Sequence, residues 1–161
     1  MIKFTECPSI TIYDMFYKCE NVLIKHKNII FFNDFSEKSR VVLNILLKVQ
    51  EYIKQDYDYI VRIEVVNEDE NHYVVFSDIL SQLKNKEYKK ALTNGGYDLI
   101  IGLDRLEELH LSEEEMKTAS CTIDNSQLRI DTYTQIPDVY NPLFWFTKKD
   151  IEKYKKWSGI K

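Results

Sequence analysis

Apolar residues recur at helical spacing between residues 36 and 54, and this is the clearest pattern in the chain. The residues that share one face are Val42, Ile45, Leu46, Val49, Tyr52 and Ile53. Polar side chains such as Lys48 and Lys54 occupy the opposite side, and Ser36 can cap the first turn. The pattern predicts an amphipathic helix that packs on a sheet or on another helix.

Several shorter segments have the alternation or the apolar runs that predict β-strands. Residues 22–32 are apolar on both sides of the polar run Lys25-His26-Lys27-Asn28, which predicts a hairpin with a four-residue turn. Residues 59–66 alternate, and the β-rich run 72–76 follows an all-polar turn, so we expect a second strand pair there. Residues 97–102 predict one more buried strand.

A second helix is expected to begin at Ser77 or Asp78 and to end at Asn94-Gly95-Gly96, because glycine readily takes the left-handed conformation at a helix end. With this helix, the order of elements over residues 22–103 is that of a ferredoxin-like βαββαβ core. We therefore expect an α+β fold, with a mixed or antiparallel sheet and helices packed on it. The first 20 residues fit a strand and a helical turn equally well.

The remainder of the chain predicts additions to this core. Residues 104–107 and 112–115 both fit the starts of short helices. Alternation over residues 119–131 predicts an extra hairpin, and Thr147 can cap a C-terminal helix. The length of 161 residues suits one domain, residues 1–161.

Composition indicates a globular chain in a reducing compartment. Hydrophobic residues make up 44% and charged residues 30%, a balance that separates the chain from disordered sequences. The three cysteines, Cys7, Cys19 and Cys121, form no CxxC pair and argue against a disulfide framework. The N-terminus lacks a signal-peptide pattern, and no apolar stretch approaches the roughly 18–20 residues of a membrane-spanning helix. We expect a cytoplasmic protein without membrane contact.

Sequence motifs for catalysis are missing. The chain has no GxxxxGK[ST], GxGxxG or GxSxG segment. The three histidines form no HxH or HExxH pair: His26, His72 and His110. Cys121 falls at an apolar strand position, which favours core packing over nucleophilic chemistry. We expect no cofactor and no metal site, although a carboxylate pair such as Glu64 with Asp131 can still assemble in space.

Charge is distributed unevenly along the chain. The 22 basic and 26 acidic residues give a formal net charge of −4, which disfavours nucleic acid as a partner. Six acidic residues in 104–115 stand against Arg105 alone, which gives −5, whereas six lysines against two acids in 148–161 give +4. The candidate partner-binding acids are Glu68, Asp69, Glu70, Asp104, Glu107, Glu108, Glu113, Glu114 and Glu115. They form either a solvated face or a surface that steers a basic protein partner.

An aromatic run at residues 140–146 is too apolar for an ordinary loop. In one interpretation it is a core plug that inserts Phe144 and Phe146. In the other it is a recognition patch, since Trp and Tyr anchor many interfaces. The whole run cannot point inward, so Tyr140 and Trp145 join the candidate partner-binding residues.

The leading interpretation is a protein-binding module that inhibits or neutralises a basic partner. In composition the chain is similar to bacterial toxin-immunity proteins and phage-encoded inhibitors. The alternative is a small enzyme acting on a nucleotide or nucleic acid, in which His72 or Glu64 converges with Asp131 or Asp104. A homo-oligomer-forming subunit is a third possibility and requires an exposed apolar patch.

Charge reversal tests the electrostatic interpretation. Changing Glu113, Glu114 and Glu115 together to Lys is expected to leave the fold intact and to slow association with a basic partner, because steering depends on the local field. Circular dichroism checks the fold, and stopped-flow association at several salt concentrations measures the rate. An association rate with unchanged magnitude and salt dependence would contradict the interpretation.

Overall fold

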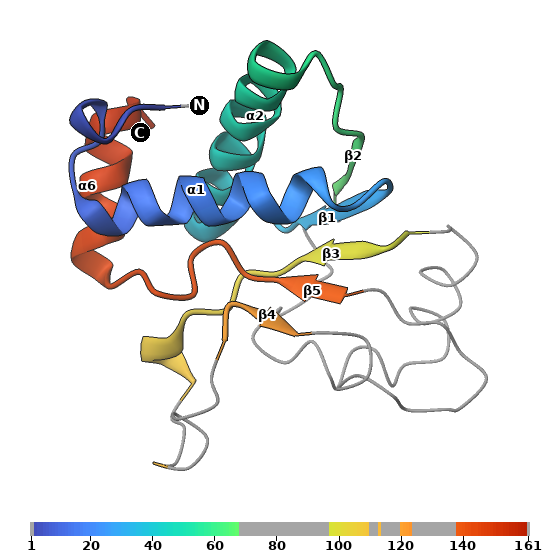
Figure 1. Cartoon of the computed structure of the whole chain (residues 1–161). Helices are drawn as coiled ribbons and strands as arrows, with labels where there is room; N and C mark the ends of the chain where they lie inside the picture. The colour runs from blue at the N-terminus through green and yellow to red at the C-terminus, as the bar shows by residue number, and fades with distance from the viewer. Residues whose placement is uncertain (1, 68–96, 110–112, 114–119, 124–137, 161) are drawn as a thin grey trace.

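The computed structural model describes residues 2–67, 97–109, 113, 120–123 and 138–160 (Figure 1). Within these residues the chain forms a sheet with three α-helices on one side of it. Two 3₁₀ turns, η1 (Phe4–Glu6) and η3 (Leu106–Glu108), complete the regular structure of this part.

Four strands of the sheet run parallel. They are β1 (Ile29–Asn33), β2 (Ile63–Asn67), β3 (Leu99–Ile101) and β5 (Asp138–Tyr140). The two-residue strand β4 (Thr122–Ile123) pairs antiparallel with β5 at the edge, and the strand order is β2-β1-β3-β5-β4. In this register Phe31 lies opposite Val65 on one side and Ile101 on the other.

The helices α1 (Ile10–Ile24), α2 (Glu37–Tyr57) and α6 (Lys148–Ser158) pack against one another above the sheet (Figure 1). Each begins at a hydroxyl residue whose side chain accepts a backbone N–H bond from the first turn: Ser9, Ser36 and Thr147. Such caps satisfy donors that the helix itself leaves unpaired. An ion pair of 3.1 Å between Lys155 and Glu37 joins α6 to α2.

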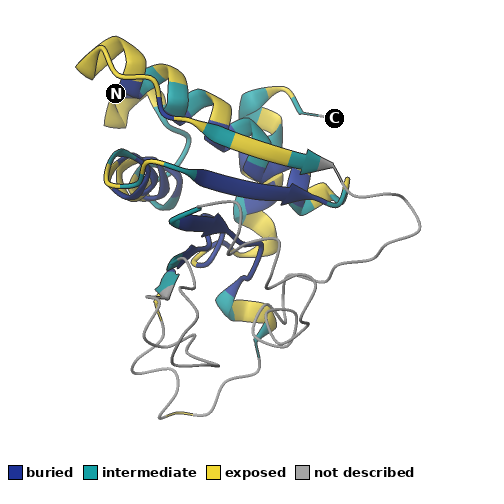
Figure 2. Ribbon diagram, turned by 90° about the vertical axis from the view of Figure 1, so that its right-hand side faces the viewer, coloured by how far each residue is buried: buried dark blue, intermediate teal, exposed yellow. Residues whose placement is uncertain are grey.

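The core lies between the helices and the sheet. Every residue of β1 and β3 is buried, and the strands in the middle of the sheet are dark blue in Figure 2. Where the three helices meet, the ring of Phe16 lies 5.9 Å from Tyr52, 6.0 Å from Tyr154 and 5.9 Å from Trp157, measured between centroids. Aromatic pairs at these separations add to the stability gained by burying apolar area.

The prediction of an α+β fold with a mixed or antiparallel sheet is wrong. In the structure, the four main strands of the sheet are parallel. Among the described strands, only the two-residue β4 runs antiparallel to its neighbour, so the fold is α/β. A ferredoxin-like core over 22–103 is excluded, because β1 is parallel to both neighbours. The continuous apolar run of β1 is typical of a parallel strand buried on both faces.

The hairpin predicted for residues 22–32 is also wrong. Val22 and Leu23 belong to α1, where they continue the buried stripe of Ile12, Phe16 and Cys19. The polar run that follows ends this helix: the backbone N–H groups of Lys25 and His26 donate to the Val22 and Leu23 carbonyls. Only the second half of the predicted hairpin is a strand.

Other predicted elements are confirmed. The helix that begins after Ser36 is α2, the strand within 97–102 is β3, and Thr147 caps α6 in a capping box with Asp150. The capping box predicted at 104–107 is wrong: the short turn there is the 3₁₀ turn η3, and its N-cap is Arg105, whose side chain makes no cap bond. Four predicted elements or parts of elements lie outside the described residues: the strand 72–76, the helix that follows it, nearly all of 112–115, and the turn and second strand of the 119–131 hairpin.

No helix in the described ranges has both the length and the apolar character needed to cross a membrane. The expectation of one domain over residues 1–161 stays a prediction.

Strand order defines where polar groups gather. The chain places β2 on one side of β1 and β3 on the other, so the order reverses at β1. In open α/β sheets, ligands bind outside the carboxyl ends of the strands at such a reversal. Six polar or charged residues are buried in the described part, and five of them follow or flank these strand ends: Asn33, Ser39, Asp104, Arg105 and Asn141.

Candidate functional site

The turn between β1 and α2 is held by the Asp34 carboxylate. Its Oδ1 accepts a bond of 2.6 Å from the Ser39 hydroxyl and one of 2.9 Å from the Ser36 backbone N–H. Burial acts to raise the pKa of Asp34, but these hydrogen bonds outweigh it and lower that pKa. The intervening Phe35 has a left-handed φ of 62° and is exposed, so the turn projects an aromatic ring into solvent.

The ends of β3, β4 and β5 meet at Asn141. Its backbone N–H donates to the Cys121 carbonyl over 2.8 Å, and its side-chain Oδ1 accepts from the Asp104 backbone N–H over 3.2 Å. A Cβ on Gly102 would collide with this Oδ1. Glycine at 102 therefore leaves room for the amide that joins the strand ends.

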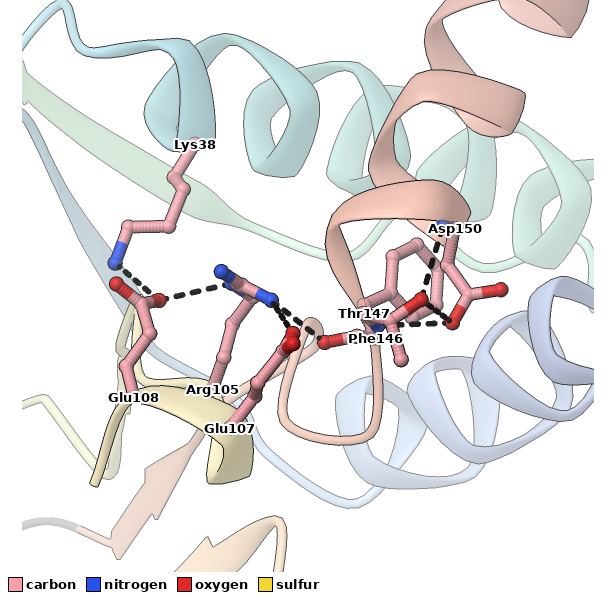
Figure 3. Close-up of polar contacts among 7 residues, drawn as sticks. All are labelled: Lys38, Arg105, Glu107, Glu108, Phe146, Thr147 and Asp150. Carbon is pink, nitrogen blue, oxygen red and sulfur yellow. Dashed lines mark hydrogen bonds and ion pairs between the residues drawn. The ribbon is translucent and has the colours of Figure 1, made fainter. Parts of the chain in front are cut away.

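Arg105 is the buried cation of this edge, with 5% of its side chain exposed. Its Nη1 donates to the Phe146 carbonyl over 2.9 Å and to Glu107 over 2.8 Å, and its Nε donates to Glu108 over 2.8 Å (Figure 3). Lys38 reaches the same Glu108 oxygen at 3.0 Å. Burial acts to raise the pKa of Glu108, but Lys38 and Arg105 lower it overall.

The segment 140–146 is fixed by these contacts. The Leu106 backbone N–H donates to the Phe144 carbonyl over 2.8 Å, and Arg105 binds the carbonyl of Phe146. Both phenylalanine side chains are buried, whereas Trp145 between them is 54% exposed. Its indole packs edge-on against the Phe144 ring, with centroids 4.8 Å apart. The core plug is therefore confirmed for the phenylalanines, and one aromatic side chain of the same segment faces solvent.

A pocket of about 500 Å³ lies between this segment and the first half of α1. The helix contributes Thr11, Asp14, Met15 and Lys18, and the other wall consists of Ser120, Cys121, Tyr140, Pro142, Trp145 and Phe146. Volumes of this size and linings with few polar groups are typical of binding sites. The exposed indole of Trp145 thus lines this pocket.

The Cys121 thiol and the Tyr140 hydroxyl, on the wall opposite α1, are poor nucleophiles. Burial raises the pKa of the Cys121 thiol, although the nearby charge of Lys18 opposes the shift. Burial also raises the pKa of the Tyr140 hydroxyl well above its ordinary value. Both groups stay protonated near neutral pH, so this wall is suited to binding by contact and hydrogen bonding.

The structure separates the predicted partner-binding residues into several groups. Glu68, Asp69, Glu70, Glu114 and Glu115 lie outside the described residues. Tyr140 and Asp104 are both buried, and Tyr140 lines the pocket described above. Glu107 and Glu108 are bonded to Arg105, and Glu108 also to Lys38, as described above. Glu113 and Trp145 are exposed.

The carboxylate and histidine site of the alternative enzyme hypothesis is not assembled by the residues that can be placed. Glu64 lies on β2 and accepts a hydrogen bond from the Tyr97 hydroxyl, whereas Asp104 follows β3 on the other side of β1. His72 and Asp131 lie outside the described residues. Across the described ranges, no three His, Cys, Asp or Glu side chains form a group that could hold a metal ion.

Sequence reasoning missed Arg105, Asn141 and the pocket. Arg105 stands alone in an acidic run, and that isolation was a usable signal, because a single cation among carboxylates is well placed to pair with them. The α1 side of the pocket was also detectable in principle. Asp14, Met15 and Lys18 follow Thr11 by three, four and seven residues, which is the spacing of one helix face. It required recognising residues 10–24 as a helix.

No protein-family model matches the chain, and no curated protein matches its sequence.

The contact between Gly102 and Asn141 gives a stability prediction. Gly102→Ala is expected to lower the free energy of unfolding by about 1–3 kcal/mol, because the new methyl displaces a buried, hydrogen-bonded amide. Urea denaturation measures this. In an Asn141→Ala background the same change should cost much less, since the colliding oxygen is gone. Equal costs in the two backgrounds would show that the amide is not the obstacle.

Proposed function

We propose that this chain is a protein-binding module that inhibits or neutralises a partner protein, and that Trp145 with its adjoining pocket is the anchor of the interface. The observation that carries the proposal is an exposed indole on a segment fixed by buried hydrogen bonds. Trp is among the residues that dominate the binding energy of protein interfaces.

Rigidity of the 140–146 segment supports this role. Binding costs conformational entropy wherever side chains or loops must be ordered. Here the backbone on either side of Trp145 is bonded to Leu106 and Arg105, and the indole packs on Phe144. An anchor that is ordered before binding loses less freedom when the partner arrives.

The pocket beside the indole suits an apolar side chain of the partner. Met15, Tyr140, Pro142 and Phe146 give it apolar surface, and the polar groups on α1 stand at its side. A side chain inserted there would contact Trp145 at the same time, which would couple the two parts of the interface.

Charge favours a basic partner. The formal net charge is −4, and a net negative molecule attracts a positive one at long range. Glu107 and Glu108 are matched by Arg105 and Lys38, so they contribute little net field; Glu113 is exposed. Steering therefore rests on the other acids and on the overall charge.

The three cysteines are free thiols, which favours a reducing compartment such as the cytoplasm. Bacterial toxin-immunity proteins and phage-encoded inhibitors are the classes of protein-binding module that this combination of features fits.

Removing the indole tests the proposal. Trp145→Ala is expected to weaken partner binding by about 30-fold or more, the loss typical of an interface hot spot. Leu47→Ala is the matched control, because Leu47 is similarly exposed, at 55%, but lies on α2. The partner is first captured from the native host with the intact chain, then purified, and titrated against all three proteins by calorimetry.

A purified partner that forms a stoichiometric complex with the intact chain and the Leu47→Ala chain, but not with the Trp145→Ala chain, would support the proposal. A partner whose affinity is the same for all three would contradict it.

A further inference from the structure

Glu20 is a buried carboxylate on the flank of α1 that faces away from the pocket. The residue is 6% exposed, and its Oε2 is fully buried with no hydrogen-bond partner in the described part of the structure. At about 100° per residue, Glu20 lies roughly half a turn around the helix from Thr11 of the pocket wall. The two sites are therefore separate.

An unbonded buried carboxylate oxygen is unfavourable for folding. Moving a carboxylate out of water costs free energy that hydrogen bonds or an opposite charge must offset. The other five buried polar residues of the described part follow or flank strand ends, whereas Glu20 is on α1, close to Tyr57 at the end of α2. Within the described chain, no hydrogen bond offsets the burial of its Oε2.

Two exposed tyrosines stand beside this carboxylate. The Tyr57 hydroxyl hydrogen-bonds Glu20, and the negative charge of Glu20 raises the pKa of Tyr57, with smaller contributions from Asp56 and Tyr17. Tyr17 comes from α1 and Tyr57 is the last residue of α2. Their side chains are 54% and 57% exposed, so both rings meet solvent next to a buried negative charge.

We propose that Glu20 is the acceptor for an arginine side chain of the partner protein, with the rings of Tyr17 and Tyr57 against the faces of its guanidinium. A planar guanidinium both stacks on aromatic rings and donates two parallel hydrogen bonds to a carboxylate. The compact, strongly hydrated ammonium of lysine fits this combination less well.

Entry of the guanidinium requires Tyr57 to turn aside. Its hydroxyl bond to one carboxylate oxygen is exchanged for bonds from the arginine, which also reaches the oxygen that lacks a partner. Tyr57 ends α2 and is more than half exposed, and side chains of this kind change rotamer within nanoseconds. The site is thus covered by a movable ring.

This inference names a second contact with the partner and rests on the proposed function in that respect. Its test is independent, because it uses N-acetyl-arginine amide in place of the partner. Titration of the isotope-labelled full chain is followed through the Glu20 carboxyl carbon and the ring signals of Tyr17 and Tyr57. Saturable shifts are expected at these three residues, and they should persist in Trp145→Ala.

Two comparisons distinguish binding at Glu20 from nonspecific electrostatic attraction of arginine to the acidic protein. Glu20→Gln is expected to weaken binding about tenfold or more, as the loss of a charge-assisted hydrogen bond implies. The matched control is Asp56→Asn, which removes the same charge from an exposed carboxylate next to Tyr57 in the chain and should change the affinity less than about twofold. The neutral analogue N-acetyl-citrulline amide should give no saturable shift.

Two tyrosine variants keep the test decisive if Glu20→Gln fails to fold. Tyr57→Phe removes the competing hydroxyl and keeps the ring, so arginine binding should be retained or strengthened; Tyr57→Ala should weaken it. Equal binding of citrulline, equal effects of Glu20→Gln and Asp56→Asn, or no difference between the Tyr57 variants would overturn the proposal.

Discussion

The carboxyl edge of the sheet depends on the side chain of Asn141. Its amide is 2% exposed and accepts the backbone N–H that follows β3, while its backbone donates to the segment that enters β4. Leaving a buried polar group of this kind unpaired costs about 1–3 kcal/mol. This one residue thus links three strand ends, through its side chain after β3 and through its backbone before β4, and the glycine at position 102 makes room for the side chain.

Two kinds of buried polar group follow from this arrangement. Asn141 and Arg105 have acceptors or donors within the chain, and together they hold the backbone that presents Trp145. Glu20 is equally buried but keeps one oxygen without a partner in the described part of the chain. Asn141 and Arg105 thus stabilise the surface around Trp145, whereas Glu20 has an acceptor oxygen that a ligand can bind. The two surfaces lie on opposite flanks of α1.

Sequence patterns predicted the elements whose signal is local. The helix after Ser36 and the capping box at Thr147 depend on spacing within a few residues, and both were found. The parallel sheet was missed because strand direction depends on contacts between distant segments. An apolar run such as 29–32 is compatible with either pairing. The sequence predicted that part of the aromatic segment is exposed, but it could not show that the exposed ring is Trp145. That depends on the bond from Arg105 to the Phe146 carbonyl, and these two residues are 41 positions apart in the chain.

The central claim is that Trp145 is held still by the strand ends beneath it. Time-resolved fluorescence anisotropy of Trp145 in a Trp157→Phe chain, where it is the single tryptophan, measures this directly. The account predicts that the indole reorients with the whole molecule, with little sub-nanosecond motion, and that Asn141→Ala releases a fast component. A dominant sub-nanosecond decay in the chain that retains Asn141 would contradict it.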